Sequence, residues 1–104
     1  EHTAERRRLE RRTRTATLDL GLQVAGQWYR DLACLAWGAE ELVHATDRLG
    51  ALRAAAADAP DADRLRAAVE LVEETRQRFA FNVDEDLACE ALACRLEEAL
   101  GTAA

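Results

Sequence analysis

Apolar residues recur along most of this chain at the three- and four-residue spacing of an α-helix. The clearest run lies between residues 18 and 36, where six apolar side chains share one helical face: Leu18, Leu22, Ala25, Tyr29, Leu32 and Ala36. This spacing is that of a helix with one buried side. No segment alternates apolar and polar residues with a period of two, so the pattern predicts an all-α domain without strands.

Turn-forming residues divide the chain into about four main helices, which together predict a small bundle. We expect them over residues 4–36, 40–57, 61–81 and 84–100. The second can break near Thr46 and Asp47. The third carries an apolar face, made of Leu65, Ala68, Val69, Val72 and Phe79.

The residues at the expected helix ends suit those positions. Three residues that tolerate left-handed backbone are expected to end helices: Gly38, Asn82 and Gly101. Pro60 suits a first helical turn, and Asp61 can cap the helix that follows. Asp84 is the expected cap of the last helix, with Glu85 and Asp86 at its positive end.

The first and last expected helices are apolar on more than one face. The first has a second stripe, formed by Leu20, Val24, Trp28 and Leu35. The last leaves only a narrow acidic edge, at Asp86, Glu90 and Glu97. A helix that is apolar nearly all round must be buried nearly all round. The second stripe is therefore our candidate subunit interface, although central helices of a compact bundle would show the same pattern.

Charge is distributed unevenly along the 104 residues, whose net charge is −6. Residues 1–16 carry six arginines against three glutamates and are predicted to form a charged helical lead-in or linker. Residues 17–104, the expected helical domain, have a charge of −9. Because glutamates interleave with the arginines, no aromatic residues do, and the body is acidic, we expect no direct binding of nucleic acid.

Few residues could carry chemistry. Cys34, Cys89 and Cys94 lack the spacing of a zinc site and are expected to be small, free core thiols. His2 and His44 are isolated. The acidic run from Asp84 to Asp86 is better explained by capping than by a cation. The glycines form no phosphate-binding loop. We therefore expect no catalytic residue, no metal, no cofactor, no nucleotide hydrolysis and no enzymatic activity.

The sequence shows no long apolar run and no signal peptide, so we expect a cytoplasmic protein without a membrane partner. The chain begins with Glu1 rather than Met, and we expect it to be part of a longer protein.

Three segments in order resemble the C-terminal collar (oligomerisation) domain of the delta-prime subunit of bacterial DNA polymerase III clamp loaders. They are Arg12–Asp19 (RTRTATLD), Gln27–Leu32 (QWYRDL) and Arg78–Leu96 (RFAFNVDEDLACEALACRL). The motif positions are Trp28, Tyr29, Arg30, Asp31, Asn82 and Val83. The sequence departs from the family pattern at Asp84–Asp86, where Asn or Pro and Arg are expected.

The resemblance implies a domain that packs with the C-terminal domains of other clamp-loader subunits, delta and gamma/tau, in DNA replication. The nucleotide and clamp contacts of that family belong to its N-terminal part, so none is carried onto this chain. Arg30 and Asp31 are expected to form an ion pair, either between helices or subunits or as an ordinary exposed pair. Alternatives are the equivalent domain of gamma/tau, and an unrelated regulatory adaptor that binds a small ligand or peptide between its helices.

Overall fold

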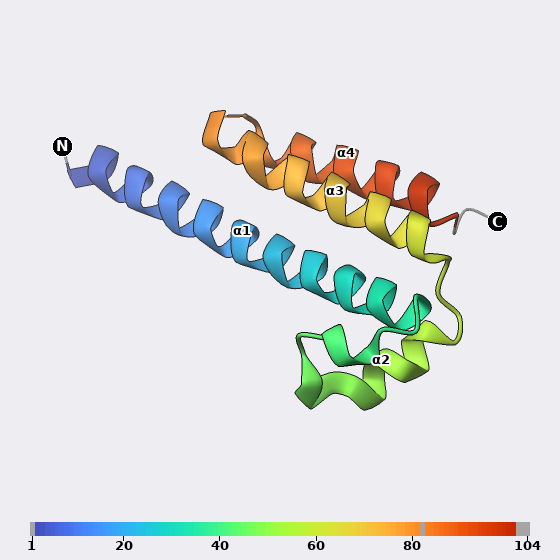
Figure 1. The fold of residues 1–104 in the computed structure, drawn as a ribbon. Helices are drawn as coiled ribbons and strands as arrows, with labels where there is room; N and C mark the ends of the chain where they lie inside the picture. The colour runs from blue at the N-terminus through green and yellow to red at the C-terminus, as the bar shows by residue number, and fades with distance from the viewer. Residues whose placement is uncertain (1, 82, 102–104) are drawn as a thin grey trace.

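The computed structural model describes residues 2–81 and 83–101, and this part of the chain is helical without strands (Figure 1). It contains four α-helices: α1 (His2–Ala36), α2 (Leu49–Ala56), α3 (Ala62–Arg78) and α4 (Glu85–Leu100). Three short 3₁₀ turns accompany them: η1 (Glu40–Leu42), η2 (Thr46–Arg48) and η3 (Phe79–Phe81). The predicted all-α bundle of about four main helices is confirmed.

The long helix α1 organises the fold. In Figure 1, α3 runs along one side of α1, and α4 lies beside α3. The short helix α2 covers the C-terminal end of α1. The molecule is elongated, with extents of 56 × 31 × 20 Å. The long axis reflects α1, whose 35 residues would span about 52 Å at a rise of ~1.5 Å per residue.

Helices α1 and α3 pack directly against each other. A Cβ atom placed on Gly26 of α1 would lie 3.5 Å from Cγ1 of Val72 on α3, an ordinary van der Waals distance. On α3, Ala68 is fully buried, as are Leu65 and Val72. The apolar face predicted for this helix is thus confirmed as its packed face, with these three residues buried and Val69 and Phe79 half-buried.

A cluster of buried aliphatic side chains lies near the C-terminal end of α1, where four segments of the chain meet. Its buried members are Leu32 of α1, Val43, Leu52 of α2 and Leu65 of α3, and Val43 belongs to residues 37–48, the connection between α1 and α2. Trp28 and Tyr29 are half-buried against this cluster. Because each element contributes one large aliphatic side chain, the short helix α2 is held by packing rather than by its own length.

A Schellman motif ends α1. The N–H of Ala39 donates to the carbonyl of Cys34 at 2.8 Å, and that of Gly38 donates to Leu35 at 3.0 Å. Gly38 has a φ of 74°, a left-handed conformation that costs glycine little. The predicted end at Gly38 is confirmed.

The caps of the later helices also match the sequence. Asp61 accepts a hydrogen bond from the N–H of Arg64 at 2.9 Å, and Asp84 accepts one from that of Leu87 at 3.1 Å. Gly101, with a φ of 68°, ends α4. Pro60 was expected in the first turn of α3 but precedes the Asp61 cap, so that expectation is wrong. The expectation for Asn82 lies outside the described residues.

The expected helix over residues 40–57 is wrong in its first half. Only Leu49–Ala56 is α-helical, and two 3₁₀ turns replace the rest. Between these turns, Val43 is extended and buried in the core. The next two backbone N–H groups donate to the side chain of Asp31 instead of to helical carbonyls. A contact with α1 therefore competes successfully with local helix propensity.

Candidate functional site

The structure divides the predicted second stripe of α1 into two parts. Leu20 and Val24 are 60% and 52% exposed. Trp28 and Leu35 are half-buried and pack against the core cluster. The two parts differ because the segment that includes η2 and α2 covers only the C-terminal part of α1 (Figure 1). Leu20 and Val24 thus form an exposed apolar pair, which we call the α1 patch.

A hollow of about 320 Å³ adjoins the α1 patch. One side of the hollow belongs to α1 and the other to the connection, and its lining consists of Val24, Gln27, Trp28, Asp31, His44, Ala45, Asp47 and Arg48. The α1 patch therefore borders a concave surface, a combination that is common where a side chain of another protein inserts.

The two charged motif residues behave differently from what we expected. Asp31 is buried, and its carboxylate accepts hydrogen bonds from the backbone N–H of His44 at 2.9 Å and of Ala45 at 3.1 Å. Arg30 is exposed and forms no ion pair with the described residues. The exposed Arg30–Asp31 pair and the inter-helix pair are wrong for the described residues, because Asp31 is buried against backbone N–H groups and adjacent helical residues point in directions about 100° apart. Pairing of Arg30 between subunits stays a prediction. Asp31 holds the connection against α1, and Arg30 is left available at the surface.

The other motif positions are mostly structural. Trp28 and Tyr29 pack against the core, as described above. Val83 is exposed, on the connection before α4, and Asn82 lies outside the described residues. These positions therefore do not converge on a single site.

The expectation that α4 is buried nearly all round is wrong for the chain by itself. Leu92 is its buried residue, whereas Leu87 is 63% exposed and Ala93 and Cys94 are also exposed. Since α4 packs mainly against α3, only one of its faces is covered. The same holds for α1, whose residues 2–14 are all exposed.

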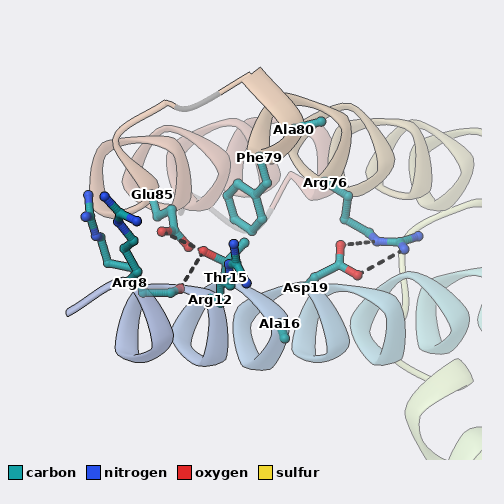
Figure 2. A pocket seen from close by; sticks show the side chains of 10 residues that line it. Arg8, Arg12, Thr15, Ala16, Asp19, Arg76, Phe79, Ala80 and Glu85 are labelled. Carbon is teal, nitrogen blue, oxygen red and sulfur yellow. Dashed lines mark hydrogen bonds and ion pairs between the residues drawn. The ribbon is translucent and has the colours of Figure 1, made fainter. Parts of the chain in front are cut away.

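A groove of about 640 Å³, with several charged side chains along it, lies between α1, the end of α3 and the start of α4. Figure 2 shows Phe79 pointing toward α1, with Arg8 and Arg12 nearby. The Thr15 hydroxyl lies 2.9 Å from the carbonyl oxygen of Arg11 and 3.0 Å from Oε1 of Glu85, and these two acceptors share its one hydrogen. Oε2 of Glu85 is buried and has no hydrogen-bond partner among the described residues.

Acidic residues reduce the positive charge of this groove. Arg14 pairs with Asp86 beside it, and Arg76 pairs with Asp19 inside it. Asp84–Asp86 thus combine capping of α4 with contacts to α1. Arg8, Arg11 and Arg12 also line the groove and form no ion pair with the described residues, so the acidic residues offset only part of its positive charge.

The ion pair between Asp19 and Arg76 predicts a pH-dependent contribution to stability. Nε of Arg76 donates to Oδ1 of Asp19 at 2.8 Å, and this hydrogen bond is the main cause that lowers the pKa of Asp19 (Figure 2). A lowered carboxyl pKa stabilises the fold above the unfolded value of about 3.9, and the contribution is lost as pH falls through the lower, folded value.

We expect Asp19→Asn to reduce the free energy of unfolding by about 0.5–1 kcal/mol at neutral pH and hardly at all near pH 2. Urea denaturation at several pH values measures this. Asp63→Asn is the matched control, because it makes the same chemical change in a weaker pair. Asp63 is much more exposed than Asp19, and its Oδ1 lies 3.6 Å from Nη2 of Arg66. An Asp19→Asn effect that is equally large at both pH values would contradict the linkage.

A groove that the sequence analysis missed lies at the junction of α1, η1 and α3. Its volume is about 420 Å³, and Trp37 and Leu42 at its edge are 72% and 68% exposed. The sequence offered one signal for this groove, the aromatic residue Trp37 directly before Gly38. A residue just beyond the end of a helix need not be buried against the neighbouring helix, so an aromatic side chain there can stay at the surface. We call this the Trp37 groove.

The described residues do not assemble a recognisable reactive centre. They contain no group of three or more His, Cys, Asp or Glu side chains placed to hold a metal ion. All three cysteines are free. Cys34 and Cys89 are half-buried, and burial raises the pKa of the Cys89 thiol. Cys94 is exposed, so its expected burial in the core is wrong. His44 is an exposed residue of the connection.

Within residues 2–81 and 83–101, no helix combines the length and apolarity needed to cross a bilayer. Comparison with known proteins finds no family model, no curated protein and no solved structure that matches this chain. Arguments about its role therefore depend on the surfaces described above.

Proposed function

We propose that this chain is a subunit-assembly domain. The complex that it joins is a cytoplasmic bacterial DNA polymerase III clamp loader, in which this chain is the C-terminal collar domain of the delta-prime subunit. The observation that carries the proposal is the α1 patch. Leu20 and Val24 expose aliphatic side chains from a rigid helix, next to a hollow and continuous with the core residues Trp28 and Leu35. Exposed apolar surface that continues a core is typical of protein interfaces.

The sequence motifs supply the more specific part of the proposal. Residues 27–32 resemble the family signature, and the structure gives them a shared location, at the part of α1 that meets α2 and the connection. A collar of several helical domains needs each domain to present apolar helix faces to its neighbours. The exposed apolar side chains of Leu20 and Val24 on α1 are compatible with that requirement.

The test is the double substitution Leu20→Glu with Val24→Glu. Burying two carboxylates in an interface is costly, whereas both remain solvated in the free chain. We expect incorporation into a complex with delta and gamma/tau subunits to weaken at least about tenfold, which corresponds to ~1.4 kcal/mol. The free energy of unfolding of the free chain should change by only about 0.5 kcal/mol. Size-exclusion chromatography of the mixed subunits and thermal melting measure the two quantities.

Leu87→Glu is the matched control, because Leu87 is 63% exposed on α4, similar to Leu20. We expect this variant to assemble like the parent. Normal assembly of the Leu20→Glu, Val24→Glu variant would remove the α1 patch from the interface. Failure of the parent chain to associate with clamp-loader subunits at all would refute the collar assignment.

A further inference from the structure

The Trp37 groove is separate from the α1 patch and has its own chemistry. Its apolar lining comes from α1, the segment after it, and α3: Ala33, Cys34, Trp37, Ala39, Leu42, Ala62 and Val69. Trp37 and Leu42 are held at the edge with most of their surface exposed to solvent. Tryptophan and arginine are enriched in binding hot spots, and this groove presents both, Trp37 and Arg30, beside a concave apolar surface.

Positive charge lies at the edge of the same groove. Of the eight arginines between residues 17 and 104, six form ion pairs within the described part of the chain, whereas Arg30 and Arg48 do not. Arg30 lines the Trp37 groove. Arg66 and Asp63 line it too, and the contact between these two side chains is a long, exposed one of 3.6 Å, so the groove carries two arginines against one carboxylate.

This local charge is opposite to that of the chain around it, since residues 17–104 carry a net charge of −9. Arg30 forms no ion pair with the described residues, and the carboxylate of its neighbour Asp31 is taken up by the backbone N–H groups of His44 and Ala45. The groove therefore offers an apolar surface and a guanidinium whose carboxylate partner must come from elsewhere.

We propose that the Trp37 groove binds an amphipathic helix of a partner protein, one that inserts aliphatic side chains between Trp37 and Leu42 and places a carboxylate against Arg30. A helix suits the site better than an extended segment, because the described residues include no strand edge to which a peptide could add. The volume of about 420 Å³ falls within the ~300–1,000 Å³ typical of binding pockets. The proposal is independent of the collar assignment and of the α1 patch.

The experiment uses the isotopically labelled chain and two synthetic helical peptides. The acidic peptide carries leucines at i and i+4 with glutamates at i+3 and i+7, so that both types share one face. The basic peptide has arginines in place of the glutamates. In an NMR titration, we expect the acidic peptide to shift the Trp37 indole signal and the Leu42 and Val69 amides. The basic peptide should bind at least about tenfold more weakly.

Two exposed positions provide the variants. Arg30→Glu should weaken binding of the acidic peptide at least about tenfold and strengthen binding of the basic one, a reversal that misfolding could not produce. Leu42→Glu should remove binding of both. Leu20→Glu is the matched control, and should leave peptide binding unchanged while lying on the other surface.

Three results would overturn the proposal. They are equal binding of the two peptides, shifts centred away from the Trp37 groove, and absence of shifts at millimolar peptide. Sedimentation of the parent chain adds a fourth. Self-association that Leu42→Glu abolishes would show that a second copy, rather than a partner helix, occupies the groove.

Discussion

Replacing Asp31 by alanine is expected to destabilise the chain by about 2–4 kcal/mol, because the substitution removes two charge-assisted hydrogen bonds at once. The carboxylate accepts from the backbone N–H groups of His44 and Ala45, and these bonds hold the connection against α1. Without them, Val43 loses the anchor beside its position in the core cluster. Urea denaturation at neutral pH measures the loss.

Two further variants separate this role from a surface ion pair. Asp31→Asn keeps the shape of the side chain but presents only one acceptor oxygen, so we expect about half the loss. Arg30→Ala should change the free energy of unfolding by less than about 0.5 kcal/mol, because Arg30 is exposed and pairs with no described residue. Similar destabilisation by Arg30→Ala and Asp31→Ala would favour the ion pair that the structure lacks.

Leu52→Ala is expected to cost about 2–5 kcal/mol, the range for removing a large aliphatic side chain from a core. Leu52 has an exposure of 0% and contacts the cluster formed with Leu32, Val43 and Leu65. The effect should be localised first at α2, since a helix of 8 residues cannot persist without packing. We therefore expect Trp28 fluorescence to shift to the red before the helical circular dichroism signal is lost.

Leu42→Ala is the matched control for Leu52→Ala. It makes the same chemical change in a neighbouring segment, but at a position that is 68% exposed, and should alter stability by less than about 0.5 kcal/mol. If Leu52→Ala and Leu42→Ala lowered the free energy of unfolding by similar amounts, packing of Leu52 would not be what holds α2. Coincident fluorescence and circular dichroism transitions would contradict local release of α2.

Most of the fold could be predicted from the sequence because its determinants are local. The caps at Asp61 and Asp84 and the end at Gly38 each depend on residues within one helical turn. The buried face of α3 follows from periodicity alone. Helical spacing and end signals are enough to place such elements, whatever they later pack against.

The surfaces were harder to predict because they depend on segments that meet only in the folded chain. The pattern of α1 cannot reveal that its second stripe changes from exposed to half-buried after Val24, since this depends on how far the segment of α2 reaches. The partners of Asp31 are backbone groups 13 and 14 residues away, which no side-chain pattern indicates. The Trp37 groove combines three segments and has no single sequence signature.

The contacts of Arg14 and Thr15 fix α1 against the start of α4 near the middle of the helix. Arg14 pairs with Asp86, and the Thr15 hydroxyl contacts Glu85. Residues 2–14 continue beyond these contacts as an exposed arm about 20 Å long. A tilt of about 10° at these contacts would displace the tip of that arm by roughly 3–4 Å. Any rearrangement that tilted α1 at this point would therefore displace the N-terminal end of the helix most.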